Sequence, residues 1–335
     1  MATTRVHPVM AATFCILLLG MGSPLVALAE DESAAAPADL PAKDAAGDKI
    51  AGPASDADSS SPEPTAADAR TQLTALGFSG QPFATAEQLT NLAENSTPKS
   101  EYDRCYQVIA EDGKDDGRGY TCYGLVGVTT KNGDALEMVE RYTAERHDNP
   151  LAKYLPVMSV KADDNTSDAE RGSLEGLEGF PEAWAAAAKD PAFRQVQDDI
   201  RDQRFTGPAL DAVQQVGLRT NLGFASMYDA SVMHGSSTDP SDPEYGDSLN
   251  ALVQRATDKA GGTPASGKVT EAQWLKSFYD VREADLRNPV NKDTQSVWSE
   301  AVDRVEVYRK LLQQGNTELR RPLKVRVNGD NFRLE

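Results

Sequence analysis

Hydrophobic residues recur every three or four positions over most of the second half of the chain. Leu136, Val139 and Tyr142 follow this spacing. A period near 3.6 residues places such side chains on one face of a helix. The spacing predicts helices over 135–146, 181–188, 192–204, 208–234, 271–287 and 294–314. Two segments rich in Gly, Ser and Asp, 162–179 and 235–246, are predicted loops.

An earlier helix is predicted from its two end signals. Thr85 followed three residues later by Gln88 is typical of a capping box. The helix is expected to stop before Pro98, which disfavours helical geometry at the preceding residue. This places Glu94 in the last turn.

Aromatic and β-branched residues are frequent in 102–110 and 120–129, which flank a Gly- and Asp-rich segment, 111–119. This pattern predicts a β-hairpin or small sheet. Cys105 and Cys122 lie symmetrically about the start of the loop, as antiparallel partners would. The chain is therefore predicted to be mainly α, with one small sheet near its start.

The first 29 residues have the features of a secretory signal peptide. Arg5 precedes an apolar stretch over 10–19, and residues 27–29 form an A-x-A cleavage site. The stretch is too short to span a bilayer, so we expect a secreted protein and no membrane anchor. Once Cys15 is removed with the signal, Cys105 and Cys122 are expected to form one disulfide.

Residues 30–69 consist mostly of Ala, Pro, Asp and Ser. Such a segment buries too little apolar surface to offset the loss of chain entropy, so it is predicted to be a disordered linker or pro-segment. The catalytic domain is expected over 70–335.

The chain carries 34 basic and 52 acidic residues, a net charge of −18. This charge opposes binding to nucleic acid or anionic lipid and favours a cationic partner, although soluble exported proteins are also often acidic. The three histidines lack metal-ligand spacing, and no nucleotide-binding loop is present. We expect no metal, no cofactor and a monomer.

Carboxylates are the candidate catalytic groups. Glu94 is expected at a helix C-terminus, where the macrodipole raises the pKa of a carboxyl and suits it to general-acid work. Asp116 is followed by Gly117 and, two residues on, by Arg118, which keep a carboxylate ionised and exposed. Beside the Thr121 hydroxyl it can activate water. Glycoside hydrolysis needs a proton donor and a separate base. However, a glutamate in a last helical turn is usually a solvated surface residue, and an Asp-Gly pair is usually only a turn.

Four motifs, which follow one another along the chain, favour a catalytic role for these carboxylates over an ordinary structural one. They are LAENS over 92–96, DGRGYT over 116–121, NGDALEMV over 132–139 and LAKYLP over 151–156. Together they closely resemble the chitosanases of glycoside hydrolase family 46. The resemblance continues through 197–202, 227–235, 278–282 and 322–324, so it spans almost all of 75–330.

The resemblance implies a lysozyme-like α+β fold, with two helical lobes flanking a substrate cleft and the small sheet in the N-terminal lobe. It implies endo-hydrolysis of the β-1,4 bonds of chitosan, a cationic polysaccharide, with inversion. Glu94 matches the general acid, Asp116 the general base and Thr121 the residue that positions water. One extra residue before Asp116 makes Asp115 a rival for the base.

Other positions match substrate-binding or supporting residues of the family. Asp134 matches a residue that binds a glucosamine ammonium group, but Asp134 with Glu137 also resembles a capping box. Arg118 and Tyr120 lie in a matching motif, and Arg118 has the alternative role of holding the carboxylates of its loop. An ion-pair network behind the acid is matched by Asp229, Arg282 and Arg304, and we expect His234 to be structural.

The sequence leaves three alternative assignments open. Family 80 chitosanases share the fold and the activity. A muramidase would act on peptidoglycan, although an acidic protein is poorly suited to an anionic cell wall. A non-catalytic chitosan-binding protein on the same fold would lack the acid or the base, and both are present here.

Overall fold

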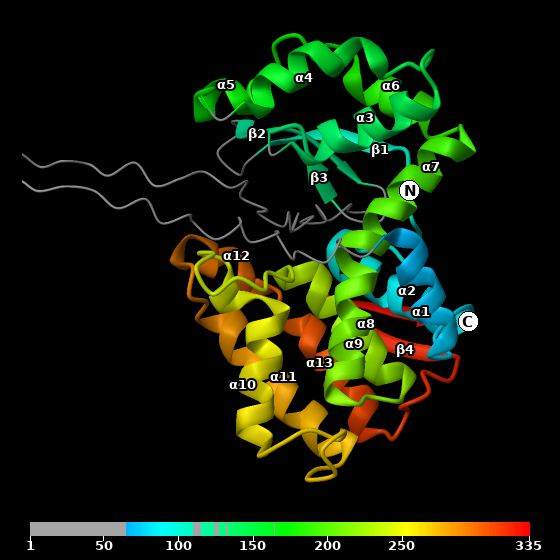
Figure 1. The fold of residues 1–335 in the computed structure, drawn as a ribbon, viewed down its shortest axis with the longest axis vertical. Coiled ribbons are helices and arrows are strands. Elements are labelled where there is room, and N and C mark those ends of the chain that lie inside the picture. Colours follow the sequence, from blue (N-terminus) through cyan, green and yellow to red (C-terminus); the bar gives the residue numbers. More distant parts are fainter. Residues whose placement is uncertain (1–64, 110–114, 124–126, 132, 164) are drawn as a thin grey trace, which may run out of the picture. The chain divides into compact units, whose positions relative to one another are not determined.

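The computed structural model describes residues 65–109, 115–123, 127–131, 133–163 and 165–335 (Figure 1). The predicted signal peptide and residues 30–64 of the predicted linker lie outside these ranges. No helix among the described residues is long and apolar enough to cross a membrane.

The described part of the chain is mainly helical, as the periodicity predicted. Its helices are α1 (Ala66–Ala75), α2 (Gln81–Asn95), α3 (Asp134–Glu145), α4 (Leu155–Ala162), α5 (Asp168–Gly172), α6 (Phe180–Ala187), α7 (Pro191–Arg201), α8 (Gly207–Val216), α9 (Asn221–His234), α10 (Leu249–Ala260), α11 (Glu271–Arg287), α12 (Gln295–Glu300) and α13 (Val302–Gln313). Short 3₁₀ turns are η1 (Ala152–Tyr154), η3 (Tyr245–Asp247) and η4 (Lys292–Thr294), and η2 (Asp202–Thr206) is a π-helix.

Two small antiparallel sheets complete the fold of the described residues. The first has the order β1 (Arg104–Ile109), β2 (Asp115–Tyr123) and β3 (Gly127–Thr129). Cys105 pairs directly with Cys122 across β1 and β2, and a disulfide joins them, as the symmetry of the two cysteines predicted. The second sheet is a hairpin of β4 (Leu323–Val327) and β5 (Asp330–Leu334), which the sequence analysis missed.

Within the described ranges, the buried apolar side chains form two clusters. One gathers side chains from the first sheet and from α3, α4, α6 and α7, and Figure 1 shows this sheet next to α3. The other is centred on α9, which is buried at every position from Leu222 to His234. A helix with no polar face has to be buried on all sides, and its one acid, Asp229, is carried into the core with it.

Helix α2 begins earlier than predicted. Its first residue is Gln81, and Pro82 lies in the first turn, where a missing N–H costs no intrahelical bond. Thr85 is therefore inside the helix, and its hydroxyl donates to the carbonyl of Gln81 at 2.8 Å. The predicted capping box is wrong, but the predicted end is right, because Ser96 follows with a left-handed φ of 54°.

Two long predicted helices are each divided in the structure. The segment 208–234 is interrupted at Gly217, whose φ of 82° ends α8 in a left-handed conformation. The segment 294–314 is interrupted at Ala301, whose N–H donates to the carbonyl of Trp298 in a tighter turn.

Several other elements differ from the prediction. Helix α10 was missed, α5 lies in a predicted loop, and α1 begins at Ala66, within the last four residues assigned to the linker. Helix α7 ends at Arg201 and continues as the π-helix η2 into α8. Strand β2 begins at Asp115, so 115–119 are strand rather than loop.

Candidate active site

Glu94 lies in the last turn of α2 and is only 4% exposed. The ordinary reading of a glutamate at this position, a solvated surface residue, is therefore wrong. Its carboxyl oxygen Oε1 is 2.7 Å from Nη2 of Arg304, which comes from α13.

Arg304 also holds Asp229, in the middle of α9. Its Nη2 and Nε donate to the two Asp229 carboxylate oxygens at 2.9 and 3.1 Å. Arg282, from α11, contributes Nη2 at 2.7 Å from Oδ2 of the same carboxylate. The structure thus brings together, on four different helices, the acid and the three residues predicted to support it.

The pKa values of the two carboxyls of this network shift in opposite directions. Burial raises the pKa of Glu94, and the neighbouring Arg304 opposes this rise without cancelling it. Burial would also raise the pKa of Asp229, but Arg304 and Arg282 together outweigh it and lower this pKa to about 2. Asp229 therefore stays ionised while Glu94 is favoured in its protonated form. The pKa of Glu94 shifts in the predicted direction, but burial, which the sequence analysis did not invoke, is the main cause.

His234 extends the network through its contact with Arg282. Nε of Arg282 donates to its Nε2 at 3.2 Å, and its Nδ1 is 3.1 Å from the carbonyl oxygen of Asp247. Burial lowers the pKa of His234 well below its usual value. A neutral ring with its proton on Nδ1 satisfies both contacts, which agrees with the structural role expected for this histidine.

The DGRGYT motif lies in β2. Thr121 is fully buried, in register with Tyr106 of β1 and Thr129 of β3. Asp115 and Asp116 begin the strand, but their side chains lie outside the described part of the structure. The choice between them as the base stays a prediction.

The two remaining residues of the motif have different surroundings. Arg118 is half-buried on β2. The Tyr120 ring stacks on Phe180 of α6, with ring centroids 6.0 Å apart.

Asp134 does not cap its helix, so the capping-box interpretation is wrong. It is the first residue of α3, after the N-cap Gly133, and makes no capping hydrogen bond. Its Oδ1 is instead 2.7 Å from Nη1 of Arg204, which also binds Glu137. Burial raises the pKa of Asp134, and its contact with Arg204 opposes that shift. Arg204 is a partner that the sequence analysis did not identify.

Comparison with known proteins decides which kind of site this is. The sequence model of glycosyl hydrolase family 46 matches residues 88–323. The chain belongs to glycosyl hydrolase family 46.

Curated relatives support the family assignment over most of their own length. The chain is 41% identical over 254 residues to a chitosanase of Bacillus subtilis strain 168, covering 76% of this chain and 85% of the relative. It is 37% identical over 248 residues to a chitosanase of Streptomyces sp. strain N174, covering 74% of this chain and 80% of the relative.

Solved family 46 structures share the fold. A native chitosanase from Bacillus subtilis MY002 is 39% identical with a TM-score of 0.65, covering 77% of this chain and 100% of its own. A family 46 chitosanase from Gynuella sunshinyii, in complex with chitotetraose, is 38% identical with a TM-score of 0.64, covering 77% and 98%. The lysozyme-like, mainly helical fold expected from the resemblance is therefore confirmed.

A second carboxyl on α2, whose side chain is half-buried, was not anticipated for this family 46 chain. Glu87 precedes Glu94 by seven residues, so the two lie on the same face of the helix. Its Oε1 is 2.5 Å from Nη1 of Arg201 on α7, and burial raises its pKa to about 7. The seven-residue spacing was the signal available in the sequence.

Among the described residues, no group of three or more His, Cys, Asp or Glu side chains is arranged to hold a metal ion.

Proposed function

We propose that this family 46 chain is a chitosanase that cleaves the β-1,4 bonds of chitosan internally and with inversion. The observation that carries the proposal is a buried Glu94, held by the Arg304–Asp229–Arg282 network, in a chain whose relatives are named chitosanases. The Gynuella sunshinyii relative binds chitotetraose, and a mutant of the Bacillus subtilis MY002 enzyme binds six GlcN units.

In this proposal Glu94 is the general acid. Its raised pKa keeps the carboxyl protonated closer to neutral pH, where it can donate to the leaving glycosidic oxygen. Arg304 occupies Oε1, so the proton is carried on Oε2. After donation, Arg304 stabilises the carboxylate that forms, which lowers the cost of burying that charge.

Asp116 is the proposed base. It deprotonates a water molecule that Thr121 helps to hold, and the water attacks the anomeric carbon on the face opposite the leaving oxygen. An inverting mechanism needs a separation of about 6.5 to 9.5 Å between the two carboxyls, so that the water fits between Asp116 and the sugar. Asp115 is the alternative base.

Substrate recognition is proposed to rest on charge. Chitosan carries ammonium groups, and the chain has a net charge of −18, which concentrates a polycation near the protein. Asp134 is proposed to bind one ammonium group. Burial raises the pKa of Asp134, and the contact with Arg204 opposes that rise, which favours the ionised carboxylate that an ammonium group would bind. Arg118 and Tyr120 are proposed to contact the sugar.

We propose further that residues 1–29 direct secretion, that 30–65 link or accompany the catalytic domain, which begins with α1, and that the enzyme acts as a monomer. The Cys105–Cys122 disulfide supports an oxidising destination.

The test is reducing-end release by the full chain from highly deacetylated chitosan, chitin and peptidoglycan. The proposal expects release from chitosan, an early fall in viscosity from internal cleavage, and products that are initially α-anomers by proton NMR. Retention on chitosan without release would favour a non-catalytic binding protein, and release from peptidoglycan alone a muramidase.

The base is tested by Asp116→Asn and Asp115→Asn made separately. The proposal expects only the first to lose activity. Loss in the second alone would transfer the role to Asp115.

A further inference from the structure

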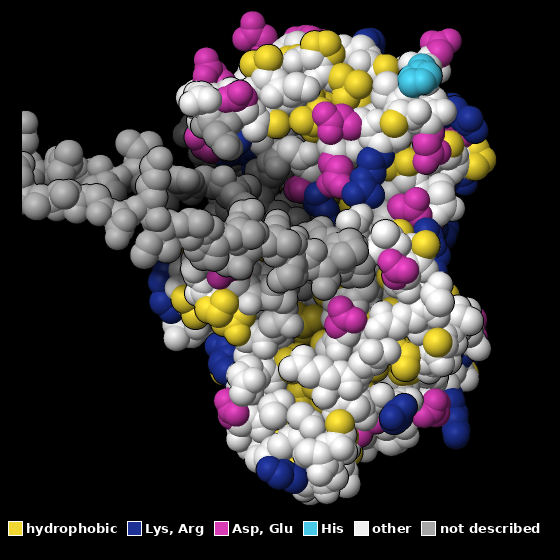
Figure 2. All heavy atoms as spheres, viewed as in Figure 1, with side chains coloured by type: hydrophobic (Ala, Val, Ile, Leu, Met, Phe, Trp, Pro, Cys, Tyr) yellow, Lys and Arg dark blue, Asp and Glu magenta, His cyan; other side chains and the backbone are white. Residues whose placement is uncertain are grey.

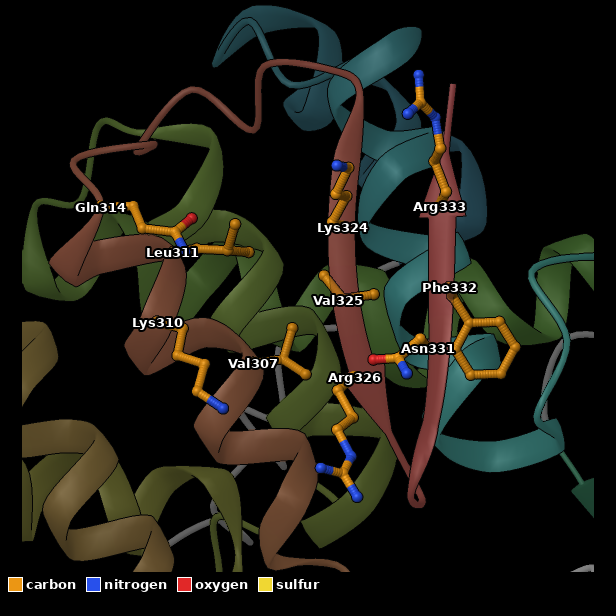
Figure 3. Close-up of a pocket in the computed structure, with 10 residues that line it drawn as sticks. All are labelled: Val307, Lys310, Leu311, Gln314, Lys324, Val325, Arg326, Asn331, Phe332 and Arg333. Atoms are coloured by element: carbon orange, nitrogen blue, oxygen red, sulfur yellow. The ribbon is translucent and has the colours of Figure 1, made fainter.

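A lysine of α4 is buried, although lysine side chains are normally solvated. Figure 2 shows Lys and Arg side chains spread over the surface of the visible face. The four basic residues that line the groove in Figure 3, between α13 and the β4–β5 hairpin, are likewise exposed: Lys310, Lys324, Arg326 and Arg333. Lys161, by contrast, is only 5% exposed. Burying an ammonium group is costly unless it is hydrogen-bonded, so the contacts of Lys161 show which part of the fold it holds.

The Lys161 ammonium group binds backbone carbonyls at the end of α5. Its Nζ donates to the carbonyl oxygen of Glu170 at 2.9 Å and to that of Ser173 at 2.7 Å. Among the described residues, no carboxylate forms an ion pair with it. The last carbonyls of a helix lack intrahelical partners, and Lys161 supplies donors to them from a neighbouring helix.

Arg171 makes the same kind of connection in the opposite direction. Its Nε donates to the carbonyl oxygen of Lys161 at 3.2 Å, and its Nη2 donates to that of Ala162 at 3.1 Å. The ends of α4 and α5 therefore hold each other through hydrogen bonds in both directions. Figure 1 shows these two helices side by side.

The two carbonyls that Lys161 binds belong to residues on either side of Gly172. A Cβ on Gly172 would lie 2.0 Å from the carbonyl oxygen of Gly117, so the backbones of α5 and β2 approach very closely here. Gly117 directly follows Asp116, the proposed base. Closely packed segments cannot shift independently, so a displaced end of α5 also displaces β2 beside the base.

We propose that Lys161 is a positioning residue for the base of hydrolysis. It fixes the end of α5, and α5 in turn holds the strand that carries the base. This inference rests on the proposed function. It holds for either candidate base, because Asp115 and Asp116 both directly precede Gly117 on β2.

The test compares Lys161→Met with Lys189→Met in the full chain. Methionine keeps much of the length of the lysine stem but has no donor, and Lys189 is exposed just after α6. On soluble chitosan we expect kcat of Lys161→Met to fall by about tenfold and KM to stay within about twofold, because the base is displaced while the sugar-binding side chains remain. Lys189→Met should match the unchanged chain.

A lower melting temperature in Lys161→Met with an unchanged kcat below it would overturn the proposal, since Lys161 would then be only structural. If Lys161→Met fails to fold, Lys161→Gln, which keeps an N–H donor on a shorter side chain, is measured in its place.

Double variants test whether Lys161 acts through α5. Gly172→Ala already displaces the same backbone contact, so adding Lys161→Met should lower kcat by less than about twofold further. In Gly207→Ala, where the added Cβ meets only ordinary contacts, Lys161→Met should keep its full effect. An equal tenfold loss in both backgrounds would overturn the proposal, because Lys161 would then act independently of Gly172.

Hydrogen exchange separates this inference from the proposed function. The amides of 115–123 should exchange at least about fivefold faster in Lys161→Met than in Lys189→Met, because β2 loses part of its support. Equal exchange in the two variants would overturn the inference. If the unchanged chain cleaves no chitosan, the proposed function fails, while the exchange result still decides whether Lys161 supports β2.

Discussion

Asp229 shows how one buried charge can contribute to the proton affinity of another buried group. It is ionised in the core because Arg304 and Arg282 both bind it, and its negative charge adds to the rise in the pKa of Glu94 that burial mainly causes. A buried ion pair of this kind contributes little net stability, so its value lies in holding Glu94 and Arg304 in a fixed electrostatic balance.

Asp229→Asn should therefore shift the pH dependence of hydrolysis. Without the negative charge, Arg304 acts on Glu94 alone and lowers its pKa, so the basic limb of kcat/KM against pH should move to lower pH. The variant should also lose about 3 to 5 kcal/mol of stability, because two arginines are left with one carboxyl. The profile is measured below its melting temperature, with Asp258→Asn as an exposed control. A basic limb that stays in place or moves upward contradicts this account.

His234 makes stability depend on pH in a predictable direction. The folded protein keeps the ring neutral, whereas the unfolded chain binds a proton near pH 6.5. The unfolded state thus binds more protons below pH 6.5, so this histidine's contribution to stability is present above that pH and is lost as the pH falls.

Between pH 6.5 and 5 the loss should be about 2 kcal/mol, at 1.36 kcal/mol per pH unit. Denaturant unfolding at each pH should show that His234→Gln removes this part of the slope. His147→Gln, at an exposed position, should keep it. Equal slopes in the two variants would show that His234 does not couple to folding.

At the scale of elements, α5 supports β2 through an unusually close backbone approach. A Cβ on Gly172 would lie 2.0 Å from the carbonyl oxygen of Gly117, the residue that follows the proposed base. Glycine is required at this position because the strand passes so close.

Gly172→Ala should displace β2 and lower kcat by about 10²-fold, the cost of a displacement near 1 Å at a reacting group. Gly207→Ala is the matched control, since a Cβ there meets only ordinary contacts of 3.5 and 3.8 Å. Reducing-end release under saturating chitosan measures both. Equal kcat values for the two variants would mean that α5 does not position the site.

The ends and pairings of helices and strands could be predicted where one local sequence signal was present and no second signal conflicted with it. The stop of α2 before Pro98 and the pairing of Cys105 with Cys122 followed from such signals. The prediction of Thr85 as the N-cap of α2 was wrong because Pro82, three residues earlier, also suits a first turn. The β4–β5 hairpin had a signal that was missed, since Asn328-Gly329 joins two short alternating strands.

Site partners were harder to predict than elements. The roles of Glu94, Asp229, Arg282 and Arg304 came from family motifs, because they lie far apart in sequence on four helices. Nothing local indicates that Arg204 binds Asp134 or that Arg201 binds Glu87. Such pairs depend on how α7 and η2 pack against α2 and α3, which periodicity alone does not determine.

For the whole molecule, the net charge of −18 should make hydrolysis sensitive to salt. The screening length falls from about 10 Å at 0.1 M salt to about 3 Å at 1 M, so attraction of polycationic chitosan weakens over this range. We expect KM to rise at least about fivefold while kcat changes little. Sucrose at equal osmolality is the control. A KM that does not change with salt would remove the role proposed for charge.

The most direct test of the central claim compares two glutamates of α2, the buried Glu94 and the half-buried Glu87. Glu94→Gln and Glu87→Gln remove the same proton from the same helix face, and each original side chain contacts an arginine. Reducing-end release from chitosan should fall by about 10²- to 10⁴-fold in Glu94→Gln, the usual contribution of a general acid, and stay within about threefold in Glu87→Gln. A folded Glu94→Gln protein with the activity of the unchanged chain would contradict the account.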